Sequence, residues 1–215
     1  MTPQRYQKIK QVIEQRQPDL TVVMENVHKA HNLAAIARTC DAVGIPEIHA
    51  VTEYEHLSLS QDASSGSGRW VNVITHDTIQ AAYSALKTKG FKLLVAHFDE
   101  RAKDFREIDY TIPTAIVVGQ ELEGISEEAI AKADATIIIP MHGMVQSLNV
   151  SVATALILYE AQKQRLQSGL YNSPKYNLLT SNNLIFEKAY PRVARIYRAK
   201  GKTYPTLDHN GQIVK

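Results

Sequence analysis

The hydrophobic residues of the middle part of the chain follow two alternating periods. Continuous apolar runs predict strands at 20–27, 47–52, 71–75, 92–98, 114–119 and 135–141. Helical spacing predicts helices at 31–44, 78–90 and 125–133. Strands that are apolar throughout and alternate with helices are typical of a parallel sheet covered on both faces. The pattern therefore predicts an α/β body over residues 20–165.

Helical patterns also flank this body. Residues 3–17 have helical spacing that ends at Pro18, so we expect an N-terminal helical extension over 1–19. The helix predicted over 147–169 is apolar on nearly every side in its first half. Such a helix must be buried on two sides, most simply by the second subunit of a homodimer. Residues 57–70, rich in Ser and Gly, predict a loop that is either a linker or a substrate flap.

Composition narrows the class of protein. The 215 residues are 44% hydrophobic, which excludes a wholly disordered chain. The one cysteine, Cys40, can form neither an internal disulfide nor a thiolate zinc cluster. No apolar run approaches the ~20 residues of a membrane span, and no apolar segment follows the first charges. We therefore expect a cytoplasmic protein without a membrane partner.

The net charge of +2 hides an uneven distribution. Residues 31–162 hold nine Lys and Arg against 17 Asp and Glu, whereas residues 163–215 hold ten against two. We expect a basic C-terminal extension over 166–215 that meets a polyanion, either nucleic acid or an anionic membrane surface. Arg192, Arg195 and Arg198 recur every third residue, and three tyrosines interleave with them. Guanidinium groups pair with phosphate and aromatic rings stack on unpaired bases, which favours RNA over lipid.

The glycines argue against the common nucleotide-binding turns. Gly44 is the first glycine, so the first strand-to-helix turn has neither a GxGxxG nor a P-loop pattern. The glycines that do follow strong strands are Gly119 and Gly124 in VVGQELEGIS and Gly143 in IPMHGMVQSLN. A loop with Gly, Met and free amides suits recognition of adenine and methionine groups through the main chain.

Three segments carry most of the unusual polar residues. They are HNLAAIARTCDAVG, VVGQELEGIS and IIIPMHGMVQSLNVSVATALILYE. In this order and spacing they resemble the SPOUT class of RNA methyltransferases, and within it the TrmH family of tRNA guanosine 2′-O-methyltransferases. The resemblance covers nearly the whole chain. It implies a trefoil knot at the C-terminal end of the body, a homodimer, S-adenosyl-L-methionine as cofactor and the guanosine at position 18 of the tRNA D-loop as substrate, with no DNA partner.

The resemblance also implies roles for individual residues. The catalytic set would be Arg38, Asn32, Glu121, Ser147 and Asn149. The cofactor would be held around Ala96, Gly119, Ile139, Met144 and Leu148. Leu122 and Glu123 depart from the basic and small polar residues expected beside the motif glutamate.

Each motif residue also has an ordinary structural interpretation. Arg38 could form an i,i+3 surface pair with Asp41. As a catalytic residue it would clamp phosphate and stabilise an alkoxide, because a guanidinium stays protonated and makes a poor base. Asn32 stands where a helix N-cap belongs, and Ser147 or Asn149 could cap the last helix. The co-occurrence of all five favours function.

Other residues and functions remain as alternatives. His28 and His31 lack a third metal ligand beside them, Cys40 suits a core, and Arg69 with Trp70 could touch RNA. The alternative functions are a ribosomal RNA 2′-O-methyltransferase of the same fold and a non-catalytic RNA-binding module.

Overall fold

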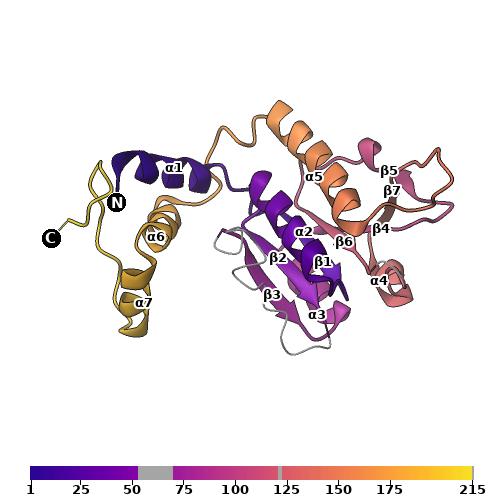
Figure 1. Cartoon of the computed structure of the whole chain (residues 1–215), viewed down its shortest axis with the longest axis horizontal. Coiled ribbons are helices and arrows are strands. Elements are labelled where there is room, and N and C mark those ends of the chain that lie inside the picture. Colours follow the sequence, from indigo (N-terminus) through magenta and orange to yellow (C-terminus); the bar gives the residue numbers. More distant parts are fainter. Residues whose placement is uncertain (53–69, 121–122, 215) are drawn as a thin grey trace. The chain divides into compact units, whose positions relative to one another are not determined.

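The structure, a computed structural model, describes residues 1–52, 70–120 and 123–214. The chain divides into two compact units, one formed by Gln17–Leu170 and the other by Met1–Arg16 together with Tyr171–Lys215 (Figure 1). The two ends of the chain, which the sequence presents as separate extensions, thus belong to the same unit. Within it the N-terminal helix α1 (Pro3–Glu14) packs against α6 (Leu178–Ala189).

The larger unit is built on a seven-stranded parallel sheet. Its order is β3-β2-β1-β6-β4-β7-β5. The strands are β1 Leu20–Glu25, β2 Glu47–Val51, β3 Asn72–His76, β4 Lys92–Ala96, β5 Lys103–Asp104, β6 Thr114–Val118 and β7 Ala135–Ile138. The α/β class and six of these strands confirm the sequence prediction. The edge strand β5 was missed because its two residues give no periodic signal.

Helices cover both faces of the sheet because the strands β1, β2, β4 and β6 bury side chains on both faces. On β1, Val22 and Met24 pack with α2 (Ala30–Ala42) and α5 (Val150–Gln167), whereas Val23 packs with α3 (Ile79–Thr88) and α4 (Glu127–Lys132). A 3-10 turn, η2, spans Phe105–Glu107. The two layers fix the loops at the strand ends in place.

Arg165 ties the end of α5 to the body. Its guanidinium is fully buried and donates to the Asp19 carboxylate at 2.6 Å and to the Tyr110 carbonyl at 2.9 Å. It also donates to Gln17 and Ile112. This arginine, counted among the basic residues of 163–215 in the sequence, is therefore a structural group of the acidic body.

The smaller unit contains α1 Pro3–Glu14, α6 Leu178–Ala189 and α7 Pro191–Ala199. The rings of Tyr190, Tyr197 and Tyr204 gather around the buried Phe186, with Tyr204 stacked on it at 4.9 Å between centroids. The tyrosines that the sequence offered for base stacking therefore pack against the unit's own core.

The two units differ in their balance of charged residues. The smaller unit holds 12 Lys and Arg against three Asp and Glu, and the larger unit holds 12 against 19. In the described part of the chain, no helix has the length and apolarity that crossing a membrane requires. Most of the predicted Ser/Gly loop, Arg69 included, lies outside the described residues, while Trp70 is half-buried.

Candidate active site

The predicted cofactor residues lie at one edge of the sheet. Strands β6, β4 and β7 are neighbours and run parallel, so their carboxyl ends share this edge. Ala96 ends β4, Gly119 directly follows β6, and Ile139 directly follows β7. Carboxyl ends of parallel strands are where α/β proteins build their ligand sites.

The backbone on either side of residues 121–122 is tightly constrained at this edge. The backbone groups of Gln120 and Gly124 bond to each other in both directions, each at 3.1 Å. A Cβ on Gly119 would lie 2.0 Å from the Gly124 carbonyl oxygen, so no other residue fits there. Gly124 has a φ of 72°, in the left-handed region that favours glycine. Both glycines of the second motif are therefore required by the backbone.

The first and third motifs meet through two asparagines. The Asn149 amide donates to the Asn32 side-chain oxygen at 3.1 Å, joining residues 117 positions apart in the sequence. Asn149 also caps α5, because its oxygen accepts from the Ser151 amide at 2.9 Å. Asn32, by contrast, is buried in the first turn of α2, whose N-cap is Lys29. The prediction of Asn32 as an N-cap is wrong, and its side-chain oxygen instead makes the contact between the motifs.

Arg38 lies two turns further along α2, with its side chain exposed to solvent. Within the described residues the structure gives its guanidinium no ion pair, and the alternative pairing with Asp41 is not formed. A protonated guanidinium without an internal partner is available to bind an anion.

The remaining site residues lie in the loop between β7 and α5. Ser147 is exposed, Leu148 is half-buried, and Met144 is 99% exposed. Glu121, the motif glutamate, lies outside the described residues, as does Leu122.

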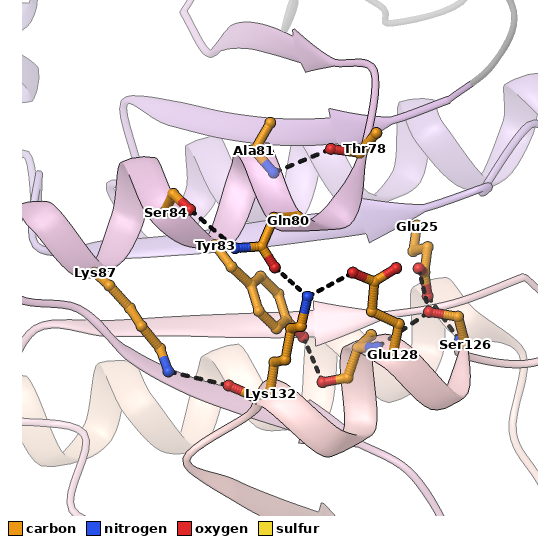
Figure 2. Close-up of polar contacts among 11 residues, drawn as sticks. Glu25, Thr78, Gln80, Ala81, Tyr83, Ser84, Lys87, Ser126, Glu128 and Lys132 are labelled. Atoms are coloured by element: carbon orange, nitrogen blue, oxygen red, sulfur yellow. Dashed lines mark hydrogen bonds and ion pairs between the residues drawn. The ribbon is translucent and has the colours of Figure 1, made fainter.

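Sequence reasoning missed one buried acid beside this edge. Glu25 ends β1 and accepts from the Ser126 hydroxyl at 2.6 Å and from the Ser126 amide at 2.8 Å (Figure 2). A glutamate at the end of a strand has no pattern that distinguishes it from a solvated carboxylate. The signal that could have found it is the capping serine before EEAIAK, whose hydroxyl needs an acceptor.

Comparison with known families now adds to this geometry. The SpoU rRNA methylase family matches residues 19–159, and the C-terminal region of the SpoU rRNA methylases matches residues 163–215. The chain belongs to the SpoU methylase family. The first match covers the sheet, both motif asparagines and Gly119, and the second covers α6 and α7.

Relatives of this SpoU methylase carry a more specific name. The chain is 51% identical over 215 residues to the tRNA (guanosine(18)-2′-O)-methyltransferase of Escherichia coli K12, covering 99% of this chain and 94% of that one. It resembles the crystal structure of the Aquifex aeolicus TrmH/SpoU tRNA modifying enzyme with a TM-score of 0.82 and 40% identity, over 88% of this chain and 97% of that one. An AdoMet-bound rRNA methyltransferase from Sinorhizobium meliloti is similar at a TM-score of 0.63 and 27% identity, over 72% and 59%.

Two further side chains of this SpoU methylase contact residues close to them in the sequence. Glu123, the acid that departs from the expected pattern, is exposed and accepts from the Gln120 amide at 2.5 Å. The His28 ring contacts the Asn26 carbonyl oxygen at 2.6 Å. Among the described residues, no three His, Cys, Asp or Glu side chains form a group that could hold a metal ion.

Proposed function

We propose that the protein transfers a methyl group from S-adenosyl-L-methionine to the ribose 2′-hydroxyl of guanosine 18 in the D-loop of tRNA. The observation that carries this proposal is the 51% identity to the Escherichia coli enzyme of that name over nearly the full length of both chains. The similarity extends through both units. It therefore includes the basic unit that would grip the RNA as well as the body that would hold the cofactor.

The edge formed by β4, β6 and β7 fits the cofactor. Ala96, Gly119 and Ile139 bring three strand ends together, and the exposed Met144 and half-buried Leu148 lie on the loop beside them. These residues would hold the adenosyl and methionine parts through main-chain groups and apolar contact. When bound, the cofactor supplies an electrophilic methyl group on a sulfonium.

Arg38 would act on the substrate. A ribose hydroxyl is a poor nucleophile while it keeps its proton, so the site must stabilise the alkoxide that develops as the proton leaves. A guanidinium group is a poor base, because it does not give up its proton in proteins. Arg38 would therefore serve as a clamp on phosphate and alkoxide, and its exposure, with no ion pair among the described residues, supports this role.

The other motif residues would position Arg38 and the ribose. The Asn149–Asn32 contact holds the start of α5 against the start of α2, which carries Arg38. Ser147, exposed two residues before Asn149, would contact the substrate or the cofactor loop. Glu121 would pair with Asn32 or Arg38 and fix its orientation.

The smaller unit would bind tRNA through phosphate contacts. Arg192 and Arg195 are exposed on α7, and within the described residues neither has a hydrogen bond or ion pair from its side chain. The Arg198 guanidinium donates to the Glu187 carboxylate at 2.7 Å and also contacts the Tyr204 hydroxyl. Arg192 and Arg195 are therefore the stronger candidates among the three predicted residues.

A homodimer would bury the exposed apolar stripe of α5. Val152, Leu156, Tyr159 and Leu166 are each 43–54% exposed and share one helix face by their spacing. This stripe supports the partner subunit that the apolar helix predicts.

The class resemblance further supports a trefoil knot in the segment from β6 to α5. The position of β6 between β1 and β4 in the sheet is compatible with such a knot. Because the substrate is tRNA, the protein would act in the cytoplasm.

Methyl transfer to an unmodified tRNA transcript tests the function. We expect one methyl per tRNA at guanosine 18, and none on a transcript with 2′-deoxyguanosine at that position. Label on ribosomal RNA fragments alone would favour the rRNA methyltransferase, and no label on any RNA, with folded protein and bound cofactor, would favour a non-catalytic RNA-binding module.

A further inference from the structure

Glu25 is an unusual residue for its position. It is 5% exposed, and it is the one Asp or Glu among the described residues that is buried. Taking a carboxylate out of water is costly unless strong hydrogen bonds replace the lost hydration. A purely structural position at a strand end could hold an apolar residue without this cost, so the carboxylate calls for an explanation.

Both carboxylate oxygens of Glu25 accept hydrogen bonds from Ser126. Oε2 accepts from the Ser126 amide at 2.8 Å, and Oε1 accepts from the Ser126 hydroxyl at 2.6 Å (Figure 2). Hydrogen bonds to an ionised acceptor are shorter and stronger than neutral ones. The Ser126 hydroxyl also accepts from the Ala129 amide at 3.1 Å and so caps α4. One buried carboxylate therefore fixes both the backbone and the side chain of Ser126.

Ser126 lies two residues beyond Gly124 and directly before α4. Gly119 directly follows β6, and the backbones of Gln120 and Gly124 are paired by hydrogen bonds. Glu25 itself lies one residue beyond the Met24–Val118 pair of the β1–β6 ladder. The β1–β6 ladder thus links β1 to the strand that precedes Gly119, and the Glu25 carboxylate links the end of β1 to the segment that follows Gly124.

We propose that Glu25 is a positioning residue that keeps the backbone of Gly119, Gln120 and Gly124 in the position that receives S-adenosyl-L-methionine. It acts through Ser126 and touches neither the cofactor nor the RNA. The inference rests on the cofactor assignment made above. Without the carboxylate, Gln120 and Gly124 keep their backbone pair, but the Ser126 side of this segment loses its link to β1, so cofactor affinity falls while the chemistry at Arg38 is retained.

Isosteric substitution separates positioning from simple stabilisation. Glu25→Gln keeps the volume but leaves one acceptor oxygen for two donors and turns an amide group toward one of them. We expect the Kd for S-adenosyl-L-methionine, measured by calorimetry, to rise about tenfold. Loss of a group that orients a binding residue typically weakens affinity by about 10- to 100-fold. The kcat at saturating cofactor and the Kd for tRNA should stay within about twofold of wild type. This is a small change, because even a tenfold change in Kd corresponds to only about 1.4 kcal/mol.

Ser126 variants provide a second route to the same result. Ser126→Ala removes the hydroxyl but keeps the amide donor, so it should weaken cofactor binding less than Glu25→Gln does. Ser126→Thr keeps the hydroxyl and should restore wild-type affinity. In the double variant Glu25→Gln with Ser126→Ala, the two losses should be less than additive, because both changes break the same contact.

Lys132→Met is the matched control on α4. The Lys132 ammonium contacts Gln80 and Glu128 on the outside of α3 and α4 (Figure 2). Its loss should lower the Tm without changing the cofactor Kd.

An unchanged cofactor Kd in Glu25→Gln, with binding intact in the wild-type protein, would overturn the role of Glu25 alone. Absence of cofactor binding in the wild-type protein would instead overturn the proposed function. If Glu25→Gln does not fold, the comparison of Ser126→Ala with Ser126→Thr decides the question.

Discussion

At the scale of single residues, Arg38 allows the sharpest test of mechanism. The side chain is exposed and, within the described residues, forms no ion pair with Asp41 or any other acid. Arg38→Ala should therefore lower kcat by about 10²–10³, as removal of one group that stabilises a developing oxyanion does. The cofactor Kd should stay close to wild type, because the cofactor edge lies at β4, β6 and β7. Single-turnover methylation and calorimetry measure the two quantities.

Arg38→Lys serves as the control for charge alone. Lysine keeps the positive charge but lacks the planar fork that pairs with phosphate in two places. We expect partial activity, between that of wild type and that of Arg38→Ala. Full activity in Arg38→Ala would contradict the clamp.

The motif residues also show how far sequence alone reaches at this scale. Asn149 is a cap, as its position suggests, but its contact with Asn32 spans 117 residues and has no local signature. Asn32 has the residue type of a cap and yet lies inside α2, because the helix begins at Ala30. The position of Glu25 at a strand end carries no pattern of its own, and the capping Ser126 indicates only that an acceptor is needed, since the tertiary fold alone brings the two residues together.

At the scale of elements, a histidine pair joins the outer strands β2 and β3. His49 is buried and its Nδ1 lies 2.8 Å from Nε2 of His76. Burial, followed by repulsion from His76, lowers the pKa of His49 from 6.5 to about 4, so the folded protein keeps this ring neutral. Burial also lowers the pKa of His76.

This pair predicts a pH dependence of stability. In the unfolded chain His49 takes up a proton below pH 6.5, whereas in the folded protein it does so only near pH 4. The unfolded state is therefore favoured as pH falls through this window, by up to about 1.4 kcal/mol per pH unit for each such proton. Urea unfolding at several pH values between 4.5 and 7 should show this loss. In His49→Leu the slope should be smaller, and an equal slope would rule out the pair as its source.

The elements themselves were largely predictable because continuous apolar runs fix the buried strands. Each strand of the β1–β6–β4 centre has buried neighbours on both faces, so its sequence is apolar throughout. The short β5 pairs only with β7 at the edge of the sheet and carries no such run. The order of the strands depends on contacts between distant segments, which no local pattern encodes.

At the scale of the whole molecule, the apolar stripe of α5 predicts the oligomeric state. Leu156 is 43% exposed in the middle of the stripe. A charge there is unfavourable in an apolar interface, so we expect the wild-type protein to sediment as a dimer and Leu156→Glu to sediment as a monomer. Leu179→Glu is the control, because Leu179 is 72% exposed on α6 in the smaller unit. A dimer that survives Leu156→Glu would place the interface elsewhere.

The distribution of charge predicts how the molecule meets its RNA. The sequence shows a basic C-terminal region, but only the structure joins it to the basic residues of α1 and shows that Arg165 is buried in the body. The smaller unit, with 12 basic and three acidic residues, is the part of the molecule suited to a polyanion. Arg192 and Arg195 on α7 are its best candidates for phosphate contacts, for the reasons given above.

Salt dependence tests these contacts directly. Each lost phosphate contact should reduce the slope of log K against log salt by about 0.7–0.9, so Arg192→Ala with Arg195→Ala should reduce it by about 1.5 and raise the tRNA Kd. Adding Arg198→Ala should change the slope less than either of the first two, because Glu187 already neutralises that guanidinium. Filter binding of unmodified tRNA at several salt concentrations measures the slopes. An unchanged slope in the triple variant would show that α7 does not bind the phosphates, and the basic residues of α1 would then be the next to replace.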